Sequence, residues 1–230
     1  MCSPREILSL LSKAYSINPK DYVAYDVCLS TRDVFKTIVA TILSQNSTDK
    51  ATYIAYNNLE KKIGISPNNI LKTSDEELME YIRNVGLANS KARYIKNAAK
   101  FFLNYSQDEL FKLSCEELRK LLISIEGVGE KTADVVLVNC FKCRVFPIDT
   151  HIRRVVTRLG IVGEKPSYAQ IANFFISSLN AEELLLAHQL LIAHGRNVCT
   201  ARKPLCDKCV LNYCCEYFNR MGKDNRANSS

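Results

Sequence analysis

Residues 125–133 read I-E-G-V-G-E-K-T-A, and this stretch decides the fold. Two glycines separated by one residue allow the backbone to turn sharply. A Ser114/Glu117 capping box and an apolar helical pattern precede the stretch, and apolar residues at helical spacing follow it. The pattern predicts a helix–hairpin–helix whose amides, at the N-terminus of the helix from about Glu130, favour phosphate oxygens. Such a hairpin grips a DNA backbone without reading its sequence; the alternative is an ordinary connection between two helices.

Helical patterns dominate the rest of the chain. Expected helix starts are Ser3, Thr31, Ser74, Ser90 and Asn180. Gly86 and Gly195 are expected helix ends. Residues 143–148 alone have an extended pattern, and Pro147 limits it. The sequence therefore predicts an all-α fold, followed by a polar, disordered tail over residues 220–230.

The composition is that of a globular protein of one or two modest domains. The 230 residues are 47% hydrophobic and 24% charged, which argues against a disordered, collagen-like or coiled-coil chain. No run approaches the roughly 20 apolar residues that span a bilayer, and the N-terminus lacks a signal-peptide core. We expect a soluble intracellular protein. Lys and Arg outnumber Asp and Glu by 31 to 24, a net charge of +7, which favours nucleic acid as a partner, although a merely basic enzyme remains the alternative.

Four cysteines near the C-terminus form a C-x6-C-x2-C-x5-C array: Cys199, Cys206, Cys209 and Cys215. The short intervening loops allow four thiolates to converge on one metal centre. The uneven spacing favours a 4Fe–4S cluster over zinc, whose sites usually show two tight C-x2-C pairs, and places disulfides third. Cys214 is the alternative to Cys215. The remaining five cysteines are expected to be buried or incidental thiols: Cys2, Cys28, Cys115, Cys140 and Cys143.

A lysine and an aspartate, Lys131 and Asp149, are candidate catalytic residues. Lys131 stands just inside the second helix of the predicted hairpin, and the alternative role for it is a phosphate-contacting or solvated lysine. Asp149, in P-I-D-T-H-I, follows a short extended segment and precedes a helical one. It is an expected N-cap, and a capping side chain has a fixed position.

Five ordered blocks resemble the endonuclease III family of DNA glycosylase/AP lyases, over roughly residues 30–217. In chain order they are I-L-S-Q-N-S-T-D-K-A-T from residue 42, V-G-L-A-N-S-K-A from 85, G-V-G-E-K-T-A-D-V-V from 127, F-P-I-D-T-H-I-R-R-V from 146 and A-H-G-R-N-V-C-T-A-R-K-P-L-C-D-K-C from 193. One departure is Glu126, because the family usually has proline before G-V-G. We expect its carboxylate to point to solvent.

The resemblance implies two helical lobes with a DNA cleft between them. Residues 32–145 would form a six-helix lobe that contains the hairpin. Residues 1–31 and 146–219 would form an iron–sulfur lobe. The implied cofactor is one 4Fe–4S cluster, held by the four cysteines of the C-terminal array.

The resemblance also implies site residues. Lys131 would be the nucleophile and Asp149 the catalytic carboxylate. Asn46 falls where the family has a glutamine that fills the gap left by the flipped base, with Gln45 as the neighbouring choice, and Leu87 resembles the apolar wedge. The expected DNA contacts are Gln45, Asn46, Leu87, Gly127, Gly129, Arg196, Arg202, Lys203 and Lys208, the last four because basic residues crowd around the cysteine loop.

The implied function is a bifunctional glycosylase/AP lyase of base excision repair that removes oxidised pyrimidines and cuts abasic sites by β-elimination. The expected partner is double-stranded DNA that contains damaged bases or abasic sites. The protein is expected to act as a monomer and not to bind a membrane. Its expected location is the cytoplasm or nucleoid, or the nucleus of a eukaryote. The main alternative is a monofunctional glycosylase acting on mismatched or alkylated bases, which normally lacks the lysine. A non-catalytic hairpin module would not need Asp149, and ferredoxin-like carriers are usually acidic.

Overall fold

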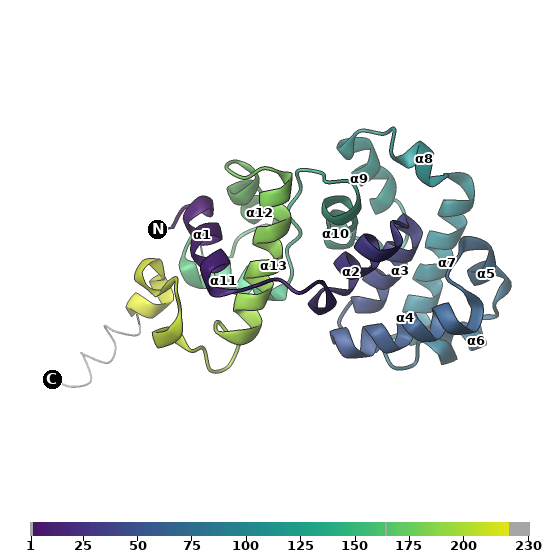
Figure 1. The fold of residues 1–230 in the computed structure, drawn as a ribbon, viewed down its shortest axis with the longest axis horizontal. Coiled ribbons are helices and arrows are strands. Elements are labelled where there is room, and N and C mark those ends of the chain that lie inside the picture. Colours follow the sequence, from purple (N-terminus) through teal and green to yellow (C-terminus); the bar gives the residue numbers. More distant parts are fainter. Residues whose placement is uncertain (1, 164, 221–230) are drawn as a thin grey trace. The chain divides into compact units, whose positions relative to one another are not determined.

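The computed structural model describes residues 2–163 and 165–220, and within them every regular element is a helix (Figure 1). The extended pattern at residues 143–148 forms no strand. The chain divides into two compact units, Asn18–Cys143 and Met1–Ile17 with Arg144–Ser230. No helix of the described residues is long and apolar enough to span a membrane. Most of the expected disordered tail, residues 221–230, lies outside the described residues.

The unit Asn18–Cys143 is built around α3. Its elements are η1 (Pro19–Asp21), α2 (Val23–Thr31), α3 (Val34–Ser44), α4 (Asp49–Ile63), α5 (Pro67–Lys72), α6 (Asp75–Tyr81), α7 (Ala88–Asn104), α8 (Gln107–Leu110), α9 (Cys115–Ile123) and α10 (Glu130–Cys140). All of α3 is buried except Lys36 and Ser44, because α2, α4, α7 and α10 surround it. Its buried hydroxyls of Thr37 and Thr41 donate to main-chain carbonyls four residues back, so burial leaves neither unsatisfied.

The unit boundary differs from the one expected after residue 31. Residues 18–31 belong with the hairpin unit because α2 packs along α3 and also contacts α10. The other unit contains α1 (Pro4–Ala14), α11 (Thr150–Leu159), α12 (Tyr168–Ile176), α13 (Ala181–Asn197), η2 (Cys206–Lys208) and η3 (Asn212–Cys214). Within it α13 packs against α1, from the opposite end of the chain, and against α11 (Figure 1).

Most of the expected helix starts are confirmed as caps. Ser3, Ser74, Ser114 and Asn180 each form a reciprocal capping box with the residue three positions later. Thr31 is an exception, because it ends α2. Asp33 caps α3 instead, by accepting from the amide of Lys36 at 2.9 Å.

Three expected helix boundaries were wrong by two to five residues. The helix of Ser74 ends at Tyr81 rather than Gly86, and α7 begins at Ala88 rather than Ser90. Helix α13 continues through Gly195 to Asn197. Glycine has a low helix propensity, but packing overrides it here.

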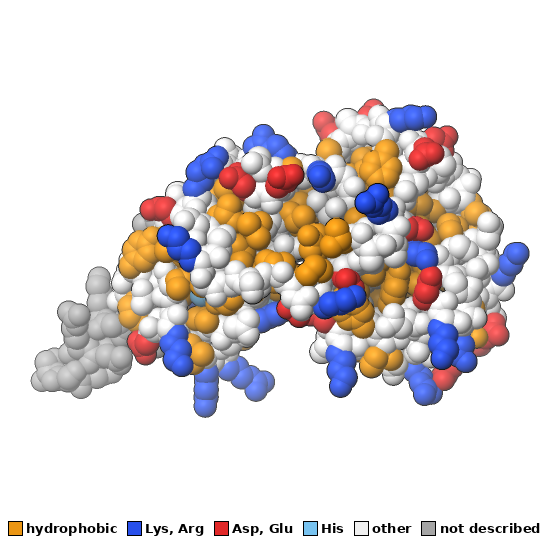
Figure 2. Space-filling model, in the orientation of Figure 1, with side chains coloured by type: hydrophobic (Ala, Val, Ile, Leu, Met, Phe, Trp, Pro, Cys, Tyr) orange, Lys and Arg blue, Asp and Glu red, His pale blue; other side chains and the backbone are white. Residues whose placement is uncertain are grey.

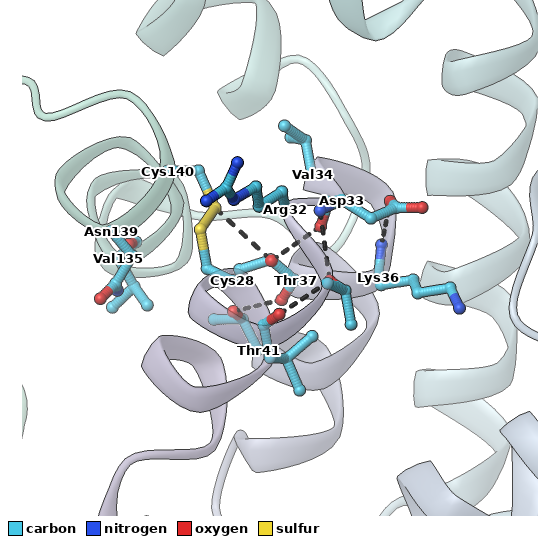
Figure 3. Close-up of a disulfide and its surroundings, with 12 residues drawn as sticks. Cys28, Arg32, Asp33, Val34, Lys36, Thr37, Thr41, Val135, Asn139 and Cys140 are labelled. Carbon is cyan, nitrogen blue, oxygen red and sulfur yellow. Dashed lines mark hydrogen bonds between the residues drawn. A yellow bond between two sulfur atoms is a disulfide. The ribbon is translucent and has the colours of Figure 1, made fainter. Parts of the chain in front are cut away.

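Six of the ten cysteines form three disulfides. The expectation that Cys2, Cys28, Cys115, Cys140 and Cys143 are buried or incidental thiols was therefore wrong. The pairs are Cys2–Cys214, Cys28–Cys140 and Cys115–Cys143, with Cα–Cα separations of 5.7, 5.9 and 5.8 Å, within the range that a disulfide spans. Figure 3 shows the second pair, which joins α2 to α10 above Thr37 of α3. The partners are 212, 112 and 28 residues apart in sequence. Spacing could not reveal them, because helix packing brings them together.

Candidate active site

The hairpin predicted from residues 125–133 consists of α9, a turn at residues 124–129, and α10. Gly127 has φ +93°, and a Cβ there would lie 2.1 Å from the ring of Tyr94, so both the backbone and the packing require glycine. Gly129 is the N-cap of α10 and offers no side-chain acceptor to the first amides of that helix. A Cβ at Gly129 would meet nothing within 4 Å. No N-cap side chain therefore satisfies the first amides of α10, and such helix N-termini favour anions.

Two arginines shape the charge around this turn. Arg119 of α9 pairs with Asp134 of α10 at 2.6 Å and with Glu130 at 3.1 Å, which joins the two hairpin helices. These partners raise the pKa of Arg119 further above its ordinary value. Arg93 of α7 pairs with Glu126 at 3.0 Å. Glu126 is exposed as expected, but its carboxylate is held against α7 rather than left in solvent.

Gln45, one of the expected DNA contacts, hydrogen-bonds to the hairpin within its own unit. It follows the last residue of α3, and its side-chain Nε2 donates to the carbonyl of Gly127 at 3.0 Å and to Oγ1 of Thr132 at 3.1 Å. Thr132 is buried and immediately follows Lys131. The structure thus brings Gln45, the turn and the start of α10 together.

Asn46 and Leu87 lie in loops with uncommon backbone conformations. Asn46 has φ +50° and an exposed side chain just after α3. Leu87 has φ +62° at the start of α7 and is 65% exposed, more than any other large hydrophobic side chain of the described residues. A left-handed leucine is costly, and so is its exposed apolar surface. The wedge role of Leu87 and the gap-filling role of Asn46 stay predictions.

Asp149 is the N-cap of α11, as its sequence context predicts. Its Oδ1 accepts from the amide of Ile152 at 2.8 Å, and its side chain is half-buried. The same helix carries Arg154 and Arg158, which hold the cysteine loop. Arg154 donates to the carbonyls of Cys199 at 2.9 Å and of Gly195 at 2.8 Å.

Arg158 continues this contact along the loop. Its guanidinium donates to the carbonyls of Thr200 at 2.7 Å and Ala201 at 2.9 Å, and lies 3.4 Å from Sγ of Cys199. Helix α11 therefore fixes both the candidate carboxylate Asp149 and the start of the cysteine loop within one unit. The sequence analysis did not single out either arginine, although Arg154 stands in the same block as Asp149 and Arg158 follows that block by three residues.

The four cysteines of the C-terminal array are the only ones of the described residues outside disulfides. Cys214, the alternative ligand, is bonded to Cys2. Cys199, Cys206, Cys209 and Cys215 line one small hollow, together with Arg158, Asn212 and apolar and aromatic residues. In the described part of the chain, no three His, Cys, Asp or Glu side chains are grouped as ligands of a single metal ion.

The hollow fits a group with negatively charged ligands. The amide of Leu211 donates to Sγ of Cys209 at 3.4 Å, and Nε2 of His194 lies 3.5 Å from the same sulfur. Such donors stabilise metal-bound thiolates. Without metal, burial raises the pKa of Cys209 to about 11 and also raises that of Cys215, so metal binding would release protons from these thiols.

The four basic residues expected to contact DNA all have exposed side chains, and all lie in the unit that holds the cysteine loop. Arg196 lies in the last turn of α13, and Arg202, Lys203 and Lys208 follow in the loop and in η2. Figure 2 shows Lys and Arg side chains projecting where the chain leaves α13. The structure groups them around the cysteine loop. Lys131, Gln45, Asn46, Leu87 and the two glycines belong to the other unit.

Comparisons with known proteins identify the family, and the family model covers the hairpin. Residues 39–180 match the HhH-GPD superfamily base excision DNA repair protein family. An endonuclease III of Sulfolobus acidocaldarius is 49% identical over 209 residues, 90% of this chain and 93% of the relative. Endonuclease III of Escherichia coli is 34% identical over 191 residues, 81% of this chain and 85% of the relative.

Two solved structures are similar over nearly the whole chain. A non-covalent endonuclease III–DNA complex matches with a TM-score of 0.81 at 26% identity, covering 97% of this chain and 100% of that one. A trapped endonuclease III–DNA covalent intermediate matches with a TM-score of 0.76 at 25% identity, covering 96% and 100%. The chain therefore belongs to the endonuclease III family, within the HhH-GPD superfamily of base excision DNA repair proteins.

Proposed function

We propose that this protein is a bifunctional DNA glycosylase and AP lyase of base excision repair, with Lys131 as nucleophile and Asp149 as the carboxylate that stabilises the reacting sugar. The observation that carries the proposal is Lys131 on the first turn of α10, directly after an open helix–hairpin–helix turn. The endonuclease III relatives and the trapped covalent DNA intermediate of a structural neighbour support the same chemistry.

The reaction begins when the damaged nucleotide leaves the base stack, at a cost of a few kcal/mol. Phosphate contacts to the hairpin amides and to the basic residues of the cysteine loop offset this cost. The exposed Leu87 occupies the stack and Asn46 fills the space that the base leaves. These contacts require no base-specific hydrogen bond, so they suit an enzyme that must search undamaged DNA.

The chemical steps follow from a lysine and a carboxylate. As the bond between C1′ and the base stretches, positive charge develops on the sugar, and the Asp149 carboxylate stabilises it. The neutral amine of Lys131 forms a bond to C1′, the base departs with a proton, and loss of the ring C1′–O4′ bond gives an imine. The imine acidifies the C2′ hydrogen. Its removal breaks the C3′–O3′ bond, and water then releases the enzyme.

We also propose that Cys199, Cys206, Cys209 and Cys215 hold one 4Fe–4S cluster. Four unpaired thiols around one hollow, with hydrogen-bond donors near two of the sulfurs, support this assignment. When bound, the cluster would hold the basic loop in shape, and this structural role is sufficient for the proposed reaction. Purified protein should contain about four irons per chain. Cys206→Ser should lose them and weaken DNA binding, whereas stoichiometric zinc without iron, in protein purified anaerobically, would contradict the assignment.

Borohydride trapping tests the lyase chemistry directly. Reduction converts the imine to a stable amine, so wild-type protein with abasic-site duplex should give a covalent adduct that peptide mapping locates at Lys131. Lys131→Ala should lose both the adduct and strand cleavage but still bind DNA, since the hairpin binds through main-chain amides. If Lys131→Ala traps and cuts at the wild-type rate, the nucleophile is another amine. Base release with no adduct from the wild type would instead indicate a monofunctional glycosylase.

Oxidised pyrimidines are the proposed substrate class. A panel of duplexes with thymine glycol, 5-hydroxycytosine, uracil, 8-oxoguanine and a plain abasic site tests this under single-turnover conditions. We expect base release from the first two to be the fastest. A preference for uracil or 8-oxoguanine would overturn the substrate class and leave the lyase chemistry in place.

A further inference from the structure

Gln45 connects three segments that the proposed reaction uses. It directly follows α3 and precedes Asn46. Its amide group has two hydrogens, and it meets two acceptors, the Gly127 carbonyl in the hairpin turn and the Thr132 hydroxyl in the first turn of α10. These acceptors lie on either side of Lys131 in the sequence. A single side chain thus holds both the turn and the helix from which the proposed nucleophile extends.

The end of α3 from which Gln45 reaches is itself fixed. Nζ of Lys91, on α7, donates to the carbonyl of Leu43 at 2.9 Å, and Lys91 is only 1% exposed. The carbonyls of the last helical turn have no partner within the helix and carry partial negative charge, so a lysine there caps α3. Lys91 lies four residues after Leu87. The C-terminal end of α3 is therefore held by Lys91 to α7, the helix that Leu87 precedes, and by Gln45 to the hairpin.

We propose that Gln45 is a positioning residue for the lyase reaction rather than a DNA contact. Its two hydrogen bonds set the orientation of the hairpin turn and of Lys131 relative to the Asn46 loop. The inference rests on the proposed function, because it assumes that Lys131 is the nucleophile. A displacement of about 1 Å at a reacting group costs up to about a hundredfold in rate, so loss of both bonds should slow chemistry far more than it weakens binding.

Gln45→Met tests the role, since methionine keeps the length and the packing but donates no hydrogen bond. Thr132→Val removes one of the two acceptors. Gln107→Met is the matched control, because Gln107 also bridges two segments of this unit, accepting from the Val34 amide at 2.9 Å and donating to the Arg32 carbonyl at 3.1 Å. The Gln107→Met variant therefore loses two comparable hydrogen bonds, neither of which joins the hairpin turn or α10.

Three quantities separate positioning from stability. They are the single-turnover cleavage rate of an abasic-site duplex at saturating enzyme, the Kd for a duplex with a non-cleavable abasic analogue, and the unfolding temperature. Gln45→Met should lower the rate by about 10- to 100-fold, with the Kd within about threefold of wild type and an unfolding temperature like that of Gln107→Met. Gln107→Met should cleave at the wild-type rate. The double variant Gln45→Met/Thr132→Val should be no slower than Gln45→Met, since both changes remove the same contact.

Three results would overturn the inference. One is a Gln45→Met rate within about twofold of wild type. Another is a Kd that increases by the same factor as the cleavage rate falls, which would show that Gln45 contacts DNA. The third is an equal loss of rate in Gln107→Met, which would indicate general loosening of the unit. Failure of the proposed function gives a different result, because wild-type protein would then form no borohydride adduct at all.

Discussion

The carboxylate of Glu126 lies 3.0 Å from the guanidinium of Arg93 and also accepts from Nδ2 of Asn97 at 3.1 Å. Both partners are on α7. Glu126 lies directly before Gly127 in the turn that we propose binds phosphate, where a free negative charge would repel DNA. The ion pair is largely exposed on both sides, so its contribution to stability is small. Its consequence is local: the Arg93 guanidinium neutralises the Glu126 carboxylate next to the proposed phosphate site.

Arg93→Ala should therefore weaken binding of undamaged duplex by about two- to fivefold, because it leaves Glu126 uncompensated. Fluorescence anisotropy at low salt measures the effect. The double variant Arg93→Ala/Glu126→Ala should restore wild-type affinity, since it removes both charges. If affinity stays low in the double variant, Arg93 contacts DNA itself and does not act through Glu126.

Asp149→Asn should slow base release by at least about a hundredfold while the protein stays folded. Asparagine caps a helix about as well as aspartate does, so the change removes the charge and keeps the cap of α11. Asp33→Asn is the matched control, because Asp33 caps α3 in the same way and has no proposed part in the chemistry. Single-turnover release from a thymine glycol duplex measures both, and equal rates for the two variants would show that the Asp149 charge is not used.

Arg202→Ala should reduce the slope of log affinity against log salt by about 1, because one phosphate contact releases about one counterion. Arg202 is exposed in the loop between Cys199 and Cys206. Lys61→Ala, at the exposed end of α4, should leave the slope unchanged. A slope for Arg202→Ala that matches wild type would place this residue outside the interface.

The hairpin, the cysteine array and the cap at Asp149 were predictable because each is a local pattern. A turn needs glycines, a metal centre needs short loops between ligands, and an N-cap acts on amides three residues away. The role of Gln45 was not predictable, since its partners are 82 and 87 residues distant in sequence and only the packing of α3 against α10 creates the contact. The same holds for Lys91. The sequence does not distinguish it from a surface lysine, and only the packing of α7 against α3 shows that it is buried.

The disulfide Cys115–Cys143 should stabilise the hairpin. It joins the start of α9 to the residue that follows α10 by three positions, and so closes the outer ends of both helices. Cys115→Ser/Cys143→Ser should lower the unfolding temperature by about 5–10 °C, because a closed loop of this length restricts the unfolded chain by roughly 3 kcal/mol. Calorimetry measures the shift, and alkylation with mass mapping reports which thiols are free. Labelling of both cysteines in untreated native protein would contradict the bond.

Lys91 gives the stability of the protein a specific dependence on pH. Burial lowers its pKa from 10.5 to about 8, while the unfolded chain keeps the ordinary value. Between about pH 8 and 10 the unfolded state therefore holds a proton that the folded state has lost, and the free energy of unfolding rises with pH by up to about 3 kcal/mol from this group. Below pH 8 both states are protonated and its contribution is constant. The neutral amine still donates to the Leu43 carbonyl, so the contact survives the titration.

Urea unfolding of wild type and Lys91→Met at pH 7.5, 9 and 10 isolates this effect, because the other titrating groups are common to both proteins. The stability of wild type relative to Lys91→Met should increase at each step in pH. Lys100→Met, at an exposed position of the same helix, should show no such trend. A wild-type advantage that is constant or falls from pH 7.5 to 10 would mean that Lys91 titrates near its ordinary pKa. Water would then have to reach its ammonium group beneath α7.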